Sequence, residues 1–117
     1  MNPLNYATLE ASKRLQAAVI VLETEAVWWE RHENHWILRP LLLCGELMVL
    51  DDKCVPAPSM AEVWRELPEG SDTYKKDMGM SAHFWNGEVC SKSFFSTNPT
   101  DALIDLLIWV RGQKGGD

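Results

Sequence analysis

The 117-residue sequence contains no apolar run long enough to cross a membrane. Its longest run of apolar residues covers only residues 17–22, whereas a membrane-spanning helix needs about twenty. The first ten residues, MNPLNYATLE, also lack the basic start and the apolar centre of a secretory signal peptide. We therefore expect no membrane association and a cytoplasmic location.

Positive charge is also scarce. Eleven Lys and Arg residues stand against seventeen Asp and Glu residues, which gives a formal net charge of −6. Because nucleic-acid binding relies on basic side chains that neutralise phosphates, we expect no nucleic-acid partner. The adjacent basic pairs are Lys13-Arg14, on an expected helix, and Lys75-Lys76, in an expected loop, and we interpret both as solvated surface.

Cysteine is the third scarce feature. Cys44, Cys54 and Cys90 are odd in number and lack CxxC spacing, so we expect reduced thiols rather than a disulfide framework. The sequence also has no GxGxxG, GxxxxGK[ST], HExxH or GxSxG pattern, which are typical of nucleotide-binding loops, zinc proteases and α/β-hydrolases. We expect no cofactor and no catalytic centre.

Two stretches in the first two thirds of the chain carry helix signals. Small and apolar residues recur at the helical period over residues 7–18, and Asn5 is the expected cap of that helix. Ser59 followed three residues later by Glu62 predicts a capping box, in which each side chain accepts a hydrogen bond from the other residue's backbone N–H. Pro68 ends this second, short helix because its ring clashes with the preceding turn.

Strand signals surround two turns. Residues 27–29 and 36–38 flank a polar turn and predict one β-hairpin, while Asn86-Gly87 is the strongest short signal for a second one. A two-residue turn at Asn86-Gly87 would place His83 opposite Cys90. The same register predicts a core face made of Met78, Met80, Ala82, Phe84, Val89 and Phe95.

The segment NPTDALIDLLIWVRG predicts a third helix that is apolar on more than one side. Asn98 is its expected cap, Pro99 its first residue and Gly112 its end, with residues 112–117 as a frayed tail. One face is sufficient for packing on a sheet, so Ile104 and Ile108, almost opposite that face, are surplus. Either the N-terminal segment or a partner chain is expected to cover them.

Hydrophobic content of 46% and charged content of 24% are ordinary for a soluble globular protein. The sequence therefore predicts a single α+β domain over residues 1–117. We expect the order α-β-β-α-β-β-α, with an antiparallel sheet of about four strands packed against the first and last helices. The path of residues 41–55 is left open.

Six tryptophans are many for 117 residues. The adjacent pair Trp28 and Trp29 must point to opposite faces of a strand, so one of them faces away from the core. If Trp28, Trp36 and Trp85 are exposed together, they form a protein-binding surface with Ile104 and Ile108. The alternative is that residues 41–55 fold over that face.

The histidines and cysteines suggest an alternative, in which the protein is a small enzyme or a metal-binding protein. His32 and His35 form an HxxH pattern beside two glutamates, but a structural metal site needs four ligands, and an exposed polar turn explains the pattern. His83 opposite Cys90 is the one pair that suggests an activated thiol. A strand pair that fills half-buried space is the simpler interpretation.

Three segments, NYATLEASKRL, PAPSMAEVWRELPE and NPTDALIDLLIWV, resemble segments of small uncharacterised proteins encoded by phages, prophages and conjugative elements of gut bacteria. Together they cover about a third of the chain, and they coincide with the expected helix caps and helix faces. The resemblance implies a shared fold and carries no functional residue over. It leads us to expect a non-enzymatic accessory protein that binds a host factor or itself.

Overall fold

The computed structural model describes residues 5–40 and 54–115, which form helices and two antiparallel sheets. The elements in chain order are α1 (Leu9–Ala17), β1 (Ala26–His32), β2 (His35–Pro40), β3 (Cys54–Pro56), α3 (Met60–Glu66), β4 (Ser71–Lys76), β5 (Gly79–Asn86), β6 (Val89–Ser96) and α4 (Pro99–Gly115).

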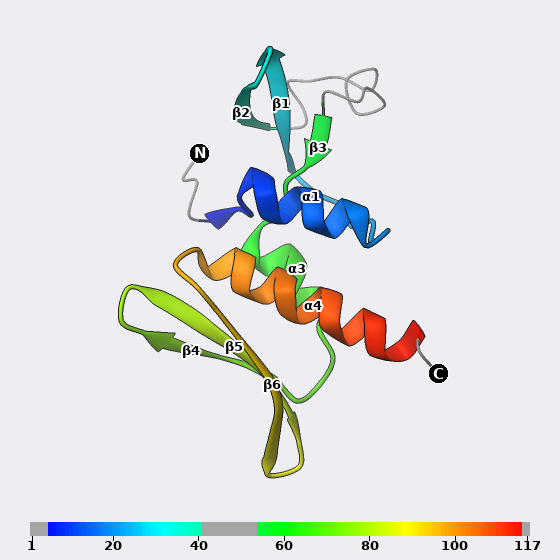
Figure 1. Cartoon of the computed structure of the whole chain (residues 1–117), viewed down its shortest axis with the longest axis vertical. Coiled ribbons are helices and arrows are strands. Elements are labelled where there is room, and N and C mark those ends of the chain that lie inside the picture. The colour runs from blue at the N-terminus through cyan, green and yellow to red at the C-terminus, as the bar shows by residue number, and fades with distance from the viewer. Residues whose placement is uncertain (1–4, 41–53, 116–117) are drawn as a thin grey trace.

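The helices lie between the two sheets (Figure 1). One sheet has the strand order β2-β1-β3 and contacts α1 through β3, and the other has the order β4-β5-β6 and contacts α4 through β5 and β6. The α+β class and the order of the expected elements are confirmed. The expected single sheet of about four strands is instead two sheets of three strands, because each hairpin gains one further strand and the helical layer keeps the sheets apart.

The added strands fall where the sequence signal was weakest. β3 lies at the end of the segment whose path was left open, and the rest of that segment, residues 41–53, lies outside the described residues. β4 contains Lys75 and Lys76, so the expected loop at this basic pair is wrong. Among the described residues, no helix is long and apolar enough to span a membrane.

Helix α4 is the centre of the hydrophobic core. Leu103, Ile104, Leu106 and Leu107 are all fully buried, together with residues of α1 and α3. α4 contacts α1 and α3 as well as β5 and β6, and this explains why it is apolar on more than one side. Ile104 is therefore buried within the chain itself, and Ile108 is half-buried against the same core.

Two of the three expected helix caps are confirmed. Ser59 Oγ accepts a hydrogen bond from the Glu62 N–H at 3.2 Å, and Glu62 Oε1 accepts one from the Ser59 N–H at 2.8 Å. Asn98 Oδ1 accepts from the N–H groups of the first turn of α4, which begins at Pro99 as expected. The cap of α1 is Thr8 rather than Asn5, because the helix begins two residues later than expected.

The C-terminal helix is longer than expected. α4 continues through Gly112 to Gly115, so the expected helix end at Gly112 is wrong. Residues 116–117 lie outside the described part of the chain. A helix already anchored by buried leucines tolerates an exposed glycine, which costs only about 1 kcal/mol relative to alanine.

The hairpin of β5 and β6 exists, but its register differs from the expected one. Asn86 pairs with Val89 around a Gly87-Glu88 turn, and an irregularity next to Phe84 adds one residue to β6. A shift by one residue moves side chains to the other face of a sheet. Phe94, opposite Ala82, therefore packs on the core, whereas Phe95 is exposed. Two further expected core residues are also exposed, Met78 in the turn between β4 and β5 and Val89 next to the turn between β5 and β6.

Candidate functional site

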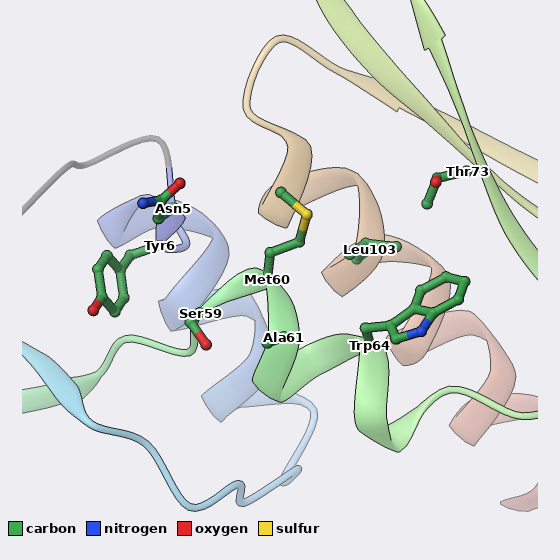
Figure 2. Close-up of a pocket in the computed structure, with 8 residues that line it drawn as sticks. All are labelled: Asn5, Tyr6, Ser59, Met60, Ala61, Trp64, Thr73 and Leu103. Atoms are coloured by element: carbon green, nitrogen blue, oxygen red, sulfur yellow. The ribbon is translucent and has the colours of Figure 1, made fainter.

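An open groove of about 530 Å³ lies between α3 and β4 and is lined mostly by apolar atoms. Figure 2 shows Met60 and Trp64 projecting from α3, with Leu103 of α4 between them and Thr73 of β4. The remaining lining residues are Asn5, Tyr6, Ser59 and Ala61. Grooves of this size with mainly apolar walls are typical ligand- or peptide-binding sites.

Local helix geometry places the two large apolar side chains of the groove. Met60 and Trp64 are four residues apart on α3, so they lie one above the other on the same side of the helix. The capping box at Ser59 fixes the start of α3, and Glu62 Oε2 also accepts the Glu25 N–H at 3.0 Å. The α3 wall is thus held at its N-terminus by the chain that precedes β1.

The N-terminal segment closes one end of the groove. Tyr6 forms an isolated antiparallel bridge with Ser59, and the Ala7 N–H donates to the Pro58 carbonyl at 2.9 Å. Asn98 Nδ2 donates to the Tyr6 carbonyl at 3.1 Å, which ties the same segment to the start of α4. Three elements distant in sequence therefore hold this end in place.

The opposite wall is an edge strand whose inner face is only partly covered. Among the residues that the structure describes, β4 pairs with β5 alone, and Thr73 lies opposite Ala82, which is fully buried in the core. Thr73 consequently points to the side of the sheet that α4 covers, yet α4 packs on β5 and β6. The inner face of β4 is left as a wall of the groove.

An exposed aromatic side chain lines the groove, and a basic residue follows two positions along its β4 wall. The Trp64 side chain retains 46% of its exposure despite its size. Lys75, two residues beyond Thr73, shares the inner face of β4 and is exposed, whereas the neighbouring Lys76 lies on the outer face. In a chain with a net charge of −6, Lys75 is a local basic group beside an apolar groove.

The residues expected to form a protein-binding surface do not lie together. Trp28 is half-buried and its Nε1–H donates to the Ala7 carbonyl at 2.9 Å, and Trp36 is half-buried with the Lys13 ammonium 4.8 Å from its ring centre. Trp85 lies in the other sheet, 37% exposed, and donates to Asp72. Ile104 is buried and Ile108 packs on the core, so neither of these two isoleucines forms an open surface.

The expected His–Cys pair is wrong. His83 lies opposite Ser93, and Cys90 lies opposite Trp85, because of the register change in β6. His32 and His35 pair across the β1–β2 turn with ring centres 6.4 Å apart. Within residues 5–40 and 54–115, no group of three or more His, Cys, Asp or Glu side chains is placed to hold a metal ion.

His83 instead belongs to a hydrogen-bonded chain on the outer face of the second sheet. Ser81 Oγ lies 3.1 Å from His83 Nε2, and His83 Nδ1 lies 2.9 Å from Asp72 Oδ1. This order matches the nucleophile, base and orienting carboxylate of acyl-transfer enzymes. However, Ser81 is on the central strand β5, whose backbone N–H groups are committed to the ladders on both sides and cannot hold an oxyanion.

No protein-family model, no curated protein and no solved structure matches the chain.

Proposed function

We propose that the protein is a non-enzymatic accessory protein that acts by binding another protein through the groove between α3 and β4. Its resemblance to small proteins of phages and conjugative elements supports a role for such an element in a bacterial cell. A protein of the host is then the expected partner. Protein binding needs no cofactor and no reaction centre.

The observation that carries this proposal is the position of Trp64. Trp64 is 46% exposed, although it lies on a helix fixed by a capping box and beside an open apolar groove. In the isolated chain, this position buries only part of its apolar surface. Tryptophan is among the residues that contribute most to protein interfaces when a partner buries it. Binding would remove the apolar walls of the groove from water.

Replacing Trp64 by alanine is expected to weaken partner binding by at least about tenfold, the effect of losing one central aromatic contact. The protein is used as bait in bacterial lysate, retained proteins are identified by mass spectrometry, and the purified candidate is titrated calorimetrically against each variant. Trp85→Ala, which removes an exposed tryptophan of the second sheet, is the matched control and should bind like the parent protein. Equal affinities for all three proteins would contradict the proposal.

A non-enzymatic protein should not react at Ser81. We expect no labelling of Ser81 by a fluorophosphonate probe, because β5 offers no free backbone donors to hold the oxyanion that forms when a serine is acylated. Labelling is read by intact-protein and peptide mass spectrometry. Modification that disappears in both Ser81→Ala and His83→Gln, but persists in Ser93→Ala, would instead identify an acyl-transfer enzyme.

A further inference from the structure

We propose that the partner supplies an extended segment that adds to the free edge of β4 as a fourth strand of the β4-β5-β6 sheet. This proposal rests on the proposed function and specifies its partner. The segment carries a large apolar side chain that enters the groove and an acidic side chain two positions away. The hydrogen-bond pattern of β4, the direction of Thr73 and the charge of Lys75 each support one part of this description.

The hydrogen-bond pattern shows which backbone groups of β4 face outward. The Trp85 N–H donates to the Gly70 carbonyl at 2.9 Å, so these opposed residues form a hydrogen-bonded pair. In an antiparallel ladder such pairs alternate with non-hydrogen-bonded ones. Thr73 and Lys75 therefore occupy non-hydrogen-bonded positions, and their N–H and C=O groups point away from β5, toward the open edge.

At Ser71, the next outward-facing position of β4, the backbone N–H already has a partner. Ser71 is also a non-hydrogen-bonded position, but its N–H donates to the Pro68 carbonyl at 3.3 Å. The open part of the edge thus centres on Thr73, which lines the groove, and on Lys75, two residues further along β4. A short added strand that pairs with these two residues would satisfy the outward-facing backbone groups of both.

Strand addition at this point determines where the partner's side chains go. Residues directly opposite each other in a sheet project to the same face. Thr73 lines the groove, so the partner residue opposite Thr73 projects into the groove, toward Met60, Trp64 and Leu103 (Figure 2). A leucine, isoleucine or methionine there would bury apolar surface that Thr73 alone leaves open to water.

The positive charge of Lys75 indicates which side chain the partner segment carries at a second position. Lys75 is exposed on the same face as Thr73 and forms no salt bridge with any residue of the described ranges. The partner residue opposite Lys75 lies two positions from the one that enters the groove, and Asp or Glu there forms a cross-strand charge pair. The partner segment thus combines an apolar residue, any residue and an acidic residue, in either direction along the chain.

A second copy of this chain fits the groove less well. If two β4 strands paired antiparallel about Thr73, each groove would receive only the other copy's Thr73 side chain. A threonine is too short to cover both Met60 and Trp64 across an opening of about 530 Å³. A segment from another protein, with a longer apolar side chain at that position, is the better occupant.

The test is a selection of random twelve-residue peptides displayed on phage against the whole protein. We expect enriched peptides to share an aliphatic residue and an Asp or Glu two positions away. A synthetic form of the best peptide is then N-methylated at one position at a time. Methylation at alternate positions should weaken binding by about tenfold or more, because those N–H groups bond to β4, while the intervening positions change it little.

Two lysine variants separate a strand interaction from general attraction to positive charge. Selection on Lys75→Glu should enrich Lys or Arg at the position that was acidic, whereas Lys76→Glu, on the outer face, should leave the original pattern unchanged. Thr73→Arg, at an exposed position, should abolish binding by filling the groove, with circular dichroism confirming that the variant is folded. Equal responses of the two lysine variants would overturn the charge pairing.

The results also distinguish failure of strand addition from failure of the proposed function. Peptides or a partner whose binding depends on Trp64, but with no alternation in the N-methyl series, would overturn strand addition and leave the groove as the binding site. A dimer in sedimentation experiments that Thr73→Arg dissociates would assign the edge to a second copy and overturn the proposed partner segment. Enrichment of no peptide that depends on Thr73 would also overturn it.

Discussion

Replacing Ile104 by alanine is expected to lower the free energy of unfolding by about 2–5 kcal/mol, the range found for large aliphatic side chains removed from a core. Ile104 is fully buried on α4, which contacts α1, α3 and the second sheet. The loss of stability has two parts. The removed methyl and methylene groups no longer contribute the free energy of transfer from water to the core, and the neighbouring helices cannot close the cavity that is left. Urea denaturation followed by circular dichroism measures this loss.

Ile108 is the matched control for this prediction. It lies one helical turn further along α4 and only partly contacts the core, so Ile108→Ala should cost clearly less, about 1 kcal/mol. If a partner chain covered both isoleucines, as the sequence left open, both substitutions would weaken association and scarcely change the stability of the monomer. A loss in Ile104→Ala that depends on protein concentration would therefore contradict the internal packing described for α4.

The helix boundaries are the part of the fold that the sequence predicted best. The capping box at Ser59 and Glu62 and the start at Asn98 and Pro99 are local signals, because the atoms involved lie within three residues of each other. The order of the expected elements follows from the same signals. The cap of α1 was predicted wrongly at Asn5, and the observed cap, Thr8, is also held by a tertiary contact with Asp101 of α4.

Strand β4 was not predictable in the same way. Its sequence, SDTYKK, has no alternation of apolar and polar residues, because an edge strand beside an open groove is exposed on much of both faces. The register of the β5–β6 hairpin failed for a related reason. The extra residue in β6 beside Phe84 has no local signature, yet it moves Phe95 out of the core and Phe94 into it.

The candidate site has β4 as one wall, so the sequence could not locate it. The apolar spacing of Met60 and Trp64 was visible, but whether Trp64 is buried depends on what packs against α3. The number of tryptophans favoured Trp28 and Trp85 instead, whose indole N–H groups already have partners within the chain. An aromatic residue whose polar group is satisfied internally has less need of an external partner.

Asp101 is expected to be the polar side chain with the largest effect on stability. It is 7% exposed, and its carboxylate accepts hydrogen bonds from the Thr8 N–H at 2.9 Å and from the Thr8 hydroxyl at 2.6 Å. The same hydroxyl accepts the Ala11 N–H at 3.1 Å. One carboxylate thus joins the first turns of α1 and α4, where both helix dipoles favour negative charge.

Asp101→Ala should therefore lower the free energy of unfolding by about 2–4 kcal/mol, since two charge-assisted hydrogen bonds are lost and the Thr8 N–H is left unpaired. Asp105→Ala is the control, because Asp105 lies one turn further along α4 and binds the half-exposed Arg14 at 3.0 Å. Such partly exposed ion pairs contribute about 1 kcal/mol or less. Urea denaturation of both variants gives the comparison.

A double-mutant cycle identifies the contact responsible. If the Asp101–Thr8 bonds account for the loss, Thr8→Ala combined with Asp101→Ala should be less destabilised than the sum of the two single variants, by at least about 1 kcal/mol. Because the N-terminal segment that carries Thr8 also closes one end of the groove, Asp101→Ala should weaken peptide binding as well. Additive losses with unchanged binding would show that the two helix starts are held together by apolar packing alone.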